Sequence, residues 1–358
     1  MIRFECDYGE GAHPRILERL ASTNDEQTPG YGEDVFCARA AALIKGACAA
    51  EGADVHFLVG GTQTNLTVIG AALKPHQGVI TAASGHIEEH ETGAIEAVGH
   101  KVLALESPDG KITGSQVDRL CRAHHGDPNH EHRVQPGMVY ISHPSENGTV
   151  YTKQELVALR EACDNWGIPL YMDGARMGYG LAAAKSRAAS GQSAGEELAL
   201  PDIAALCDAF YIGGTKVGAL CGEALVIASE GLKKDFRYHI KQRGAMLAKG
   251  RMLGIQFEVL FEDGLYMEIS EHAVKMADLL RNAFALKGYE FRYDSPTNQV
   301  FPILPEDAIH ALAEKYAFFE WEGAGEKGGK RWAAVRLCTS WATREEHIRQ
   351  LTDDIAKL

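Results

Sequence analysis

The 358-residue sequence lacks the features that mark membrane, nucleic-acid-binding and disulfide-stabilised proteins. No apolar run approaches the ~20 residues that a bilayer-spanning helix needs. Positive charge is in deficit, and the net charge of −13 opposes non-specific binding to nucleic acid or anionic membranes. The eight cysteines form no Cys-x-x-Cys pair, and residues 1–7 lack the apolar core of a secretory signal. We therefore expect reduced thiols and a cytoplasmic protein without nucleic-acid or membrane partners.

The remaining composition is that of a globular protein, with 45% hydrophobic and 24% charged residues. Helical patterns alternate with short apolar runs at residues 54–59, 78–82, 138–142, 168–172, 209–212 and 224–228. This alternation predicts βαβ units around a mainly parallel sheet. The length allows a second domain, and we place the boundary near residue 250, between domains 1–250 and 251–358.

Helices are expected at residues 34–50 and 152–166, and Thr152 with Glu155 matches a capping box. Long helices are expected at 231–262 and 265–287, followed by short strands near 299–303, 318–321 and 333–337 and a closing helix. The His-rich residues 124–132 and the Ser/Gly-rich residues 186–196 are expected to be loops.

Lys216 and Asp173 each follow a short apolar run and are surrounded by small residues. Such runs predict buried strands, so both side chains should lie at the carboxyl edge of the sheet, where open α/β sheets bind ligands. A lysine can form a Schiff base with the aldehyde of pyridoxal phosphate (PLP), and an aspartate can keep the pyridine nitrogen protonated. The alternative is a surface lysine and a turn aspartate without a shared role. We favour the PLP interpretation because both residues occur in the same context.

The segment Gly60-Gly61-Thr62 follows a predicted strand and opens a predicted helix. Backbone N–H groups at such a start can bind a phosphate, although glycine turns before helices are common without this role. Thr215 could add a hydroxyl group to the cofactor site.

His86 also begins a helix after a strand, where an imidazole could stack on a pyridine ring and transfer a proton. A simple cap or surface histidine is the alternative. His90 and Glu91 follow one turn later, but their order and spacing do not match the known metalloprotease signature, so we expect no metal.

Six segments, taken in order, resemble the threonine aldolases, and the resemblance runs over residues 5 to 350. The segments are Gly32-Glu33-Asp34, Gly60-Gly61-Thr62, Gly85-His86, Asp173-Gly-Ala-Arg176, Gly-Gly-Thr-Lys216 and Val335-Arg336. These enzymes belong to the β-eliminating lyase group of fold-type-I PLP-dependent enzymes. The resemblance implies a large α/β domain with a mainly parallel sheet, and a smaller α+β C-terminal domain.

The resemblance also implies roles for individual residues. Lys216 would hold PLP, Asp173 would contact its ring nitrogen, and Arg176 would contact its phenolic oxygen and border the substrate. His86 would stack on the ring, and Arg336 would bind the substrate carboxylate. Arginine suits this last role independently, because its planar fork matches a carboxylate.

Further residues are assigned by the resemblance alone. Tyr31 would reach the active site of a neighbouring subunit, which implies a homodimer or homotetramer with shared sites. Cys6 stands where the family usually has a serine that helps to bind the substrate carboxylate. His132 would handle the β-hydroxyl proton, and His130 is a near alternative.

The expected activity is PLP-dependent cleavage of a β-hydroxy-α-amino acid, such as threonine or allo-threonine, to glycine and an aldehyde. A β-eliminating lyase or an aminotransferase would use the same cofactor residues. A PLP-binding protein without turnover is the alternative from another class.

Overall fold

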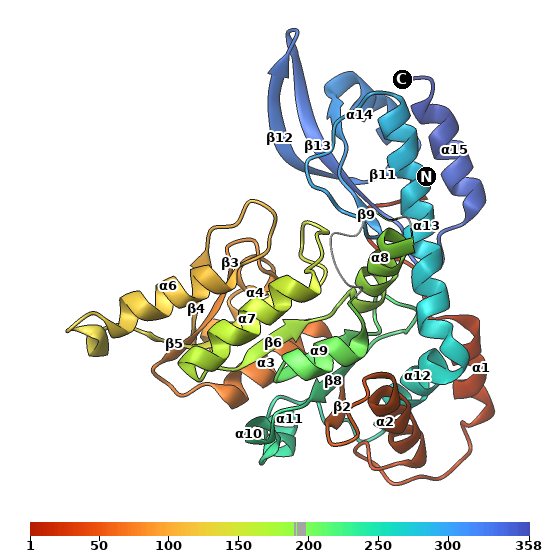
Figure 1. The fold of residues 1–358 in the computed structure, drawn as a ribbon. Helices are drawn as coiled ribbons and strands as arrows, with labels where there is room; N and C mark the ends of the chain where they lie inside the picture. The colour runs from red at the N-terminus through yellow and green to blue at the C-terminus, as the bar shows by residue number, and fades with distance from the viewer. Residues whose placement is uncertain (190, 192–197) are drawn as a thin grey trace.

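The computed structural model describes residues 1–189, 191 and 198–358. Across these residues, no helix is both long enough and apolar enough to cross a membrane. The chain forms a large α/β region around one sheet and a smaller α+β region near the C-terminus (Figure 1).

The central sheet has seven strands in the order β2-β8-β7-β6-β5-β3-β4. Strands β3 to β7 run parallel, whereas β8 is antiparallel to both of its neighbours. The strands are β2 (Asp54–Leu58), β3 (Gln77–Ala82), β4 (Lys101–Leu105), β5 (Gln135–Ser142), β6 (Leu170–Asp173), β7 (Ala209–Gly213) and β8 (Glu223–Ile227). Every residue of β6, β7 and β8 is buried, as expected for central strands with helices on both faces.

The helices of the large region cover both faces of this sheet. Those that contribute to the core on one face are α1 (Pro14–Ser22), α2 (Val35–Ala47), α6 (Gly114–His125), α7 (Lys153–Trp166), α8 (Met177–Ala189), α9 (Leu200–Leu206), α12 (Arg251–Phe261) and α13 (Leu265–Leu286). Those on the other face are α3 (Gly61–Ala72), α4 (His86–Glu89), α5 (Ala94–Ala97), α10 (Glu230–Lys233) and α11 (Phe236–Gln242).

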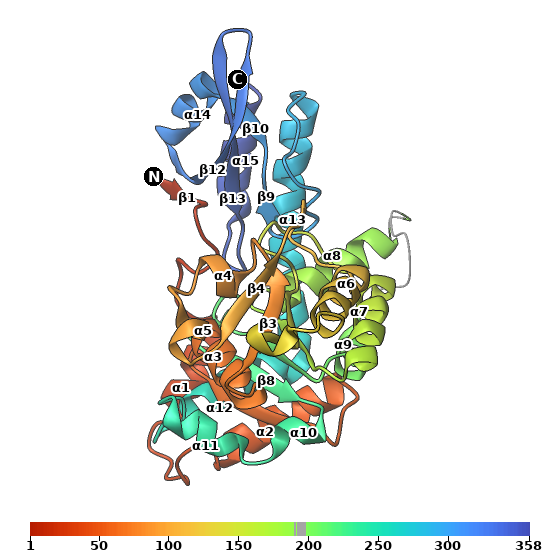
Figure 2. The ribbon, with the colours of Figure 1, turned by 90° about the vertical axis from the view of Figure 1, so that its left-hand side faces the viewer.

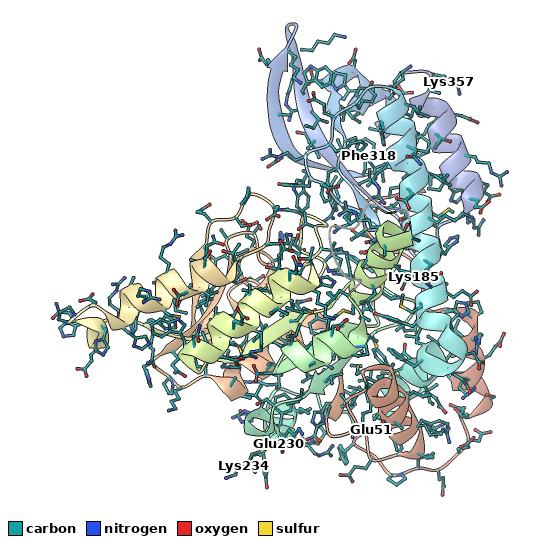
Figure 3. All side chains as sticks on the ribbon, in the orientation of Figure 1. Glu51, Lys185, Glu230, Lys234, Phe318 and Lys357 are labelled. Carbon is teal, nitrogen blue, oxygen red and sulfur yellow. The ribbon has the colours of Figure 1, made fainter. Side chains whose placement is uncertain are left out.

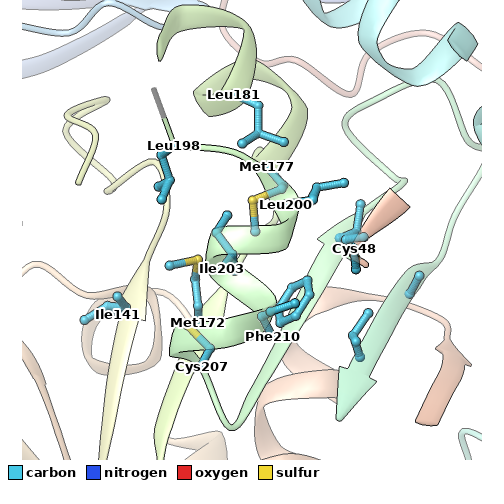
Figure 4. Close-up of a cluster of buried hydrophobic side chains, with 14 of the residues drawn as sticks. Cys48, Ile141, Met172, Met177, Leu181, Leu198, Leu200, Ile203, Cys207 and Phe210 are labelled. Carbon is cyan, nitrogen blue, oxygen red and sulfur yellow. The ribbon is translucent and has the colours of Figure 1, made fainter. Parts of the chain in front are cut away.

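Side chains that alternate along the strands contribute to the hydrophobic cores on both faces of the sheet. Met172 and Phe210 face the first set of helices, where they lie near Met177 of α8 and Ile203 of α9 (Figure 4). The alternate residue Tyr171 belongs to the opposite core. Because successive strand residues point to opposite faces, these strands are buried on both sides.

The smaller region contains a long β12–β13 hairpin with three further strands and two helices. Its elements are β9 (Gln299–Val300), β10 (Ile303–Pro305), α14 (Glu306–Ala313), β11 (Tyr316–Ala317), β12 (Phe319–Lys327), β13 (Lys330–Cys338) and α15 (Glu345–Ile355). The N-terminal strand β1 (Ile2–Arg3) pairs with β11 in this region. Figure 2 shows β1 beside the smaller region. Helix α13 runs from the large region into the smaller one (Figure 1). A separate core forms here around Phe284, Leu304 and Leu337. The division into domains near residue 250 stays a prediction; α12, beyond that residue, packs on α2 in the large region.

Most of the expected elements are present, and several local expectations need correction. The expected helix 231–262 is interrupted, because Asp235 and Gly244 adopt left-handed backbone conformations with φ of 60° and 71°. The His-rich segment is partly helical, with α6 reaching His125 and a short 3-10 helix, η1, at His130–His132. A second 3-10 turn, η2 (Glu262–Gly264), leads into α13. The expected loop 186–196 begins as the last turn of α8, and residues 190 and 192–197 lie outside the described residues.

The helix starts follow the expected chemistry. Thr152 and Glu155 form the capping box of α7, and Asp34 accepts the N–H of Cys37 at the start of α2. Charged side chains such as Glu51 and Lys234 point outward around this framework (Figure 3).

Gly114 in the first turn of α6 is required by the contact between α6 and α7. A Cβ atom on this residue would lie 2.3 Å from the carbonyl oxygen of Ala158. We expect Gly114→Ala to destabilise the protein by about 1–3 kcal/mol, because the two backbones must separate. The measurement is urea unfolding followed by far-UV circular dichroism. Gly46→Ala on the exposed side of α2 meets open space and should not lower the midpoint. Equal midpoints for the two variants would contradict the packing argument.

Candidate active site

The candidate site lies at the carboxyl edge of the parallel strands. Asp173 ends β6, Lys216 follows β7 by three residues, Gly60 follows β2, and His86 follows β3. These residues line one cavity of about 740 Å³, together with Arg176 and Arg336. The structure therefore brings together, in one place, residues from four different strand ends.

The turn that carries Lys216 is held by a buried glutamate. Glu223, at the start of the antiparallel strand β8, accepts the N–H of Gly214 at 3.0 Å and the hydroxyl of Thr215 at 2.8 Å. Tyr179 donates its hydroxyl to the carbonyl of Lys216 at 2.5 Å. Burial raises the pKa of the Glu223 carboxyl to about 8. Both sides of the lysine turn are thus fixed by side chains from other elements.

The carboxylate of Asp173 is buried and accepts four hydrogen bonds. Tyr211 donates to Oδ1 at 2.5 Å, and Tyr140 donates to Oδ2 at 2.6 Å. Asn65 also donates to Oδ2 at 3.0 Å, and the N–H of Ala175 donates to Oδ1 at 3.0 Å. Burial alone would raise the pKa of the Asp173 carboxyl, but the charge of His86 and these hydrogen bonds hold it below its usual value. The group is therefore an anion at neutral pH.

His86 belongs to the same network. Its Nδ1 lies 2.9 Å from Oε1 of Glu91, which also accepts the side-chain N–H of Asn65 at 2.7 Å. Burial lowers the pKa of His86, but the hydrogen bond to Glu91 and the charge of Glu146 raise it above the ordinary value. His90 also lines the cavity, with its ring centroid 5.6 Å from that of His86. Within the described residues, no three metal-ligating side chains are grouped to hold an ion.

Arg176 makes a buried bidentate ion pair with Asp7. The two N–O distances are 2.6 and 3.0 Å, and Asn298 donates a further hydrogen bond to Asp7 at 2.9 Å. Burial opposes the charge of Arg176, but Asp7 and the nearby Glu146 raise its pKa. The pair fixes the guanidinium at the cavity wall and ties the N-terminal segment to the sheet.

Gly60, Gly61 and Thr62 line the cavity at the N-terminus of α3. Gly60 is the N-cap residue, and no side chain caps the first N–H groups of this helix. A Cβ atom on Gly60 would meet nothing within 4 Å. The exposed donors and the open space can accommodate an anion such as a phosphate.

His132 does not line this cavity in its own chain, and its expected role with the β-hydroxyl proton stays a prediction. It lies with His130 in η1, which precedes β5, whereas Ser142 at the other end of β5 pairs with Asp173. Strand β5 therefore separates both histidines from the cavity. His86 and His90 are the histidines that line the cavity of this chain.

Two further expected residues lie outside the cavity lining. Tyr31 is 48% exposed, has a φ of 62°, and packs against Lys241. Cys6 lies one residue before Asp7 and is partly buried, while Tyr8 is the residue of this segment that lines the cavity.

Several site residues have no recognisable motif in the sequence. Tyr140 and Tyr211 occupy apolar strand runs, where an aromatic residue indicates core packing. Phe319 and Trp321 line the cavity from β12. Glu223 could have been found from the sequence, because an acidic residue at the start of a buried apolar strand needs a hydrogen-bond or charged partner.

Comparisons with known proteins identify the family of this chain. A family model described as beta-eliminating lyase matches residues 13–317. A low specificity L-threonine aldolase of Pseudomonas sp. is 30% identical, over 99% of this chain and 96% of the relative. A threonine aldolase structure from Leishmania major has a TM-score of 0.92 at 43% identity, covering 100% of this chain and 99% of that chain. Aspartate aminotransferase of Thermus thermophilus has a TM-score of 0.69 at 16% identity, covering 100% and 91%, which concerns the fold alone.

These findings confirm the fold-type-I architecture that the sequence predicted. The chain belongs to the β-eliminating lyase family, and the Pseudomonas and Leishmania relatives described above, at 30% and 43% identity, are threonine aldolases. The roles expected for individual residues stay predictions.

The Asp7–Arg176 pair provides a test of the site's internal stability. Asp7→Asn should destabilise the protein by up to about 3–5 kcal/mol, because buried Arg176 loses its bidentate partner and keeps only the carboxylate of Glu146 at 3.9 Å. The folded-state pKa of Asp7 is below its ordinary 3.8, so the stabilisation is present above that pH and is lost as the pH falls further. Urea unfolding of the wild type and the Asp7→Asn variant is measured at several pH values. The difference between their free energies of unfolding should narrow below about pH 4.

Asp263→Asn is the matched control, because Asp263 pairs with Arg15 while 77% exposed. Asp263→Asn should lower the free energy of unfolding by less than about 1 kcal/mol. An Asp7→Asn variant as stable as this control would contradict the role of the buried pair.

Proposed function

We propose that this protein cleaves a β-hydroxy-α-amino acid, threonine or a relative, to glycine and an aldehyde, with PLP as its cofactor. The proposal is supported above all by Lys216, Asp173 and Arg336, which converge on one cavity in a chain of this family. The threonine aldolase names of its relatives favour threonine as the substrate.

The residues of the cavity fit PLP. The amine of Lys216 would bind the aldehyde, the carboxylate of Asp173 would hold the pyridinium proton, and Arg176 would face the phenolic oxygen. Gly60 to Thr62, at the uncapped start of α3, would receive the phosphate. When bound, PLP supplies an electron-withdrawing ring that stabilises negative charge at the substrate Cα.

The chain's own residues would orient the substrate and move its protons. Arg336 would bind the α-carboxylate through its planar N–H fork. His86 has a raised pKa, so it would act mainly as a charged donor. His90 is the second imidazole of the cavity, and we assign to it, or to a water that it orients, acceptance of the β-hydroxyl proton. Loss of that proton accompanies cleavage of the Cα–Cβ bond, which releases the aldehyde and leaves the electron pair of the broken bond at Cα. A proton then taken up at Cα completes glycine.

A product assay separates this function from its rivals. Purified holoenzyme given threonine should release acetaldehyde without a keto-acid acceptor. An aminotransferase would need the acceptor, an eliminating lyase would release ammonia and a keto acid, and a binding protein would give no product. Lys216→Ala should lose the covalent cofactor and nearly all turnover. Borohydride reduction and peptide mass mapping identify the modified lysine, and modification at another lysine would overturn the cofactor assignment.

We further propose that the active enzyme is a homodimer or homotetramer with shared sites. Tyr31 supports this proposal, because its ring is half exposed and does not line the cavity of its own chain. An obligate interface of this kind buries above ~2,000 Å² in total.

The eight unpaired thiols favour a reducing compartment, the cytoplasm.

Mixing two impaired variants tests the shared site. Tyr31→Ala should lower activity while Lys216 keeps its bound cofactor. Mixed Tyr31→Ala and Lys216→Ala chains should regain part of the activity, because some hybrid sites carry both intact residues. Activity in each mixture is compared with the sum of the separate variants after subunit exchange. A fully active monomer in light scattering would contradict shared sites.

A further inference from the structure

Two aromatic rings of β12 lie against the guanidinium of Arg336. The Cζ atom of Arg336 is 5.3 Å from the ring centroid of Phe319 and 4.8 Å from that of Trp321. All three side chains line the same cavity as Lys216. Both distances are within the range of cation–π attraction.

The N–H edge of Arg336 is largely unused. Its one hydrogen bond with a described residue runs from an Nη atom to the carbonyl of Glu5, at 3.2 Å. Its Nε is buried and has no partner among the described residues. Within that same part of the chain, no carboxylate lies at ion-pair distance from its guanidinium. The in-plane donors are therefore available to an anionic group in the cavity.

The local strand geometry accounts for this arrangement. Phe319 on β12 lies directly opposite Arg336 on β13. The register shifts between Glu320 and Glu322, so Trp321 is the extra residue of a bulge. Bulges re-aim side chains, and here the indole also packs edge-to-face on Phe301 at 5.5 Å. Trp321 is thus also packed against the buried side chain of Phe301.

We propose that Phe319 and Trp321 are positioning residues for ligand recognition, which hold Arg336 so that its N–H edge binds the α-carboxylate of an amino acid. This inference rests on the proposed function only in taking an amino acid as the ligand. The aromatic rings attract the cation through its face and leave its donors free. An acidic partner would instead occupy those donors and oppose binding of a second carboxylate.

The test is calorimetric titration of PLP-loaded protein with glycine and with glycinamide, which lacks the carboxylate. Trp321→Ala should weaken glycine binding roughly 5- to 30-fold, as expected from the loss of one such contact. It should leave glycinamide binding nearly unchanged. Trp321→Phe should recover most of the glycine affinity, because it retains an aromatic face. Phe319→Ala should show the same selective loss and serves as the test if Trp321→Ala does not fold.

Trp332→Ala is the matched control, because Trp332 lies on the same hairpin and packs against Lys327, away from the cavity. It should not change the affinity for either ligand. Unchanged glycine binding in both Trp321→Ala and Phe319→Ala, or equal loss of glycine and glycinamide, would overturn the proposal. Selective loss in a protein that releases no aldehyde from threonine would leave this inference intact and would contradict the proposed function alone.

Discussion

The buried carboxylate of Asp173 is the constraint on which the arrangement of the site depends. Removing a carboxylate from water costs several kcal/mol unless hydrogen bonds and charges compensate. Here the compensation comes from Tyr140 on β5, Tyr211 on β7 and Asn65 on α3. These groups must converge on the end of β6, which fixes the order and register of the three central strands. Because Asn65 also bonds to Glu91, the same requirement positions His86.

A second buried charge joins the two regions of the chain at this cavity. Strand β1 pairs with β11 of the smaller region, and the N–H of Cys338 donates to the carbonyl of Phe4. Asp7 follows directly and binds Arg176 at the end of the sheet. The ion pair therefore couples the smaller region, which carries Arg336, to the strand end that carries Asp173. Asp173 and Arg336 are thus held in one framework by this contact.

Local sequence was sufficient to predict the position of a site residue where an apolar run ends in a chemically distinctive side chain. Asp173 and Lys216 could be predicted to lie together because parallel strands end at one edge. Strand β4 was not predicted, since its edge position leaves Lys101 and Ala104 exposed and gives no continuous apolar run. The break after α10 was also not predicted, because the left-handed backbone at Asp235 has no strong sequence signal.

The groups that approach the cavity from distant segments could not be predicted in the same way. Asp7 and Trp321 are separated from Asp173 by more than a hundred residues each, and neither lies in a motif that states its partner. Their positions depend on how β1 and the β12–β13 hairpin pack, including a bulge that a sequence does not reveal. His132 precedes β5 and does not line the cavity of its own chain, so its expected role stays a prediction. Motifs at strand ends thus predict the residues at the sheet edge, whereas long-range packing determines which other side chains line the cavity.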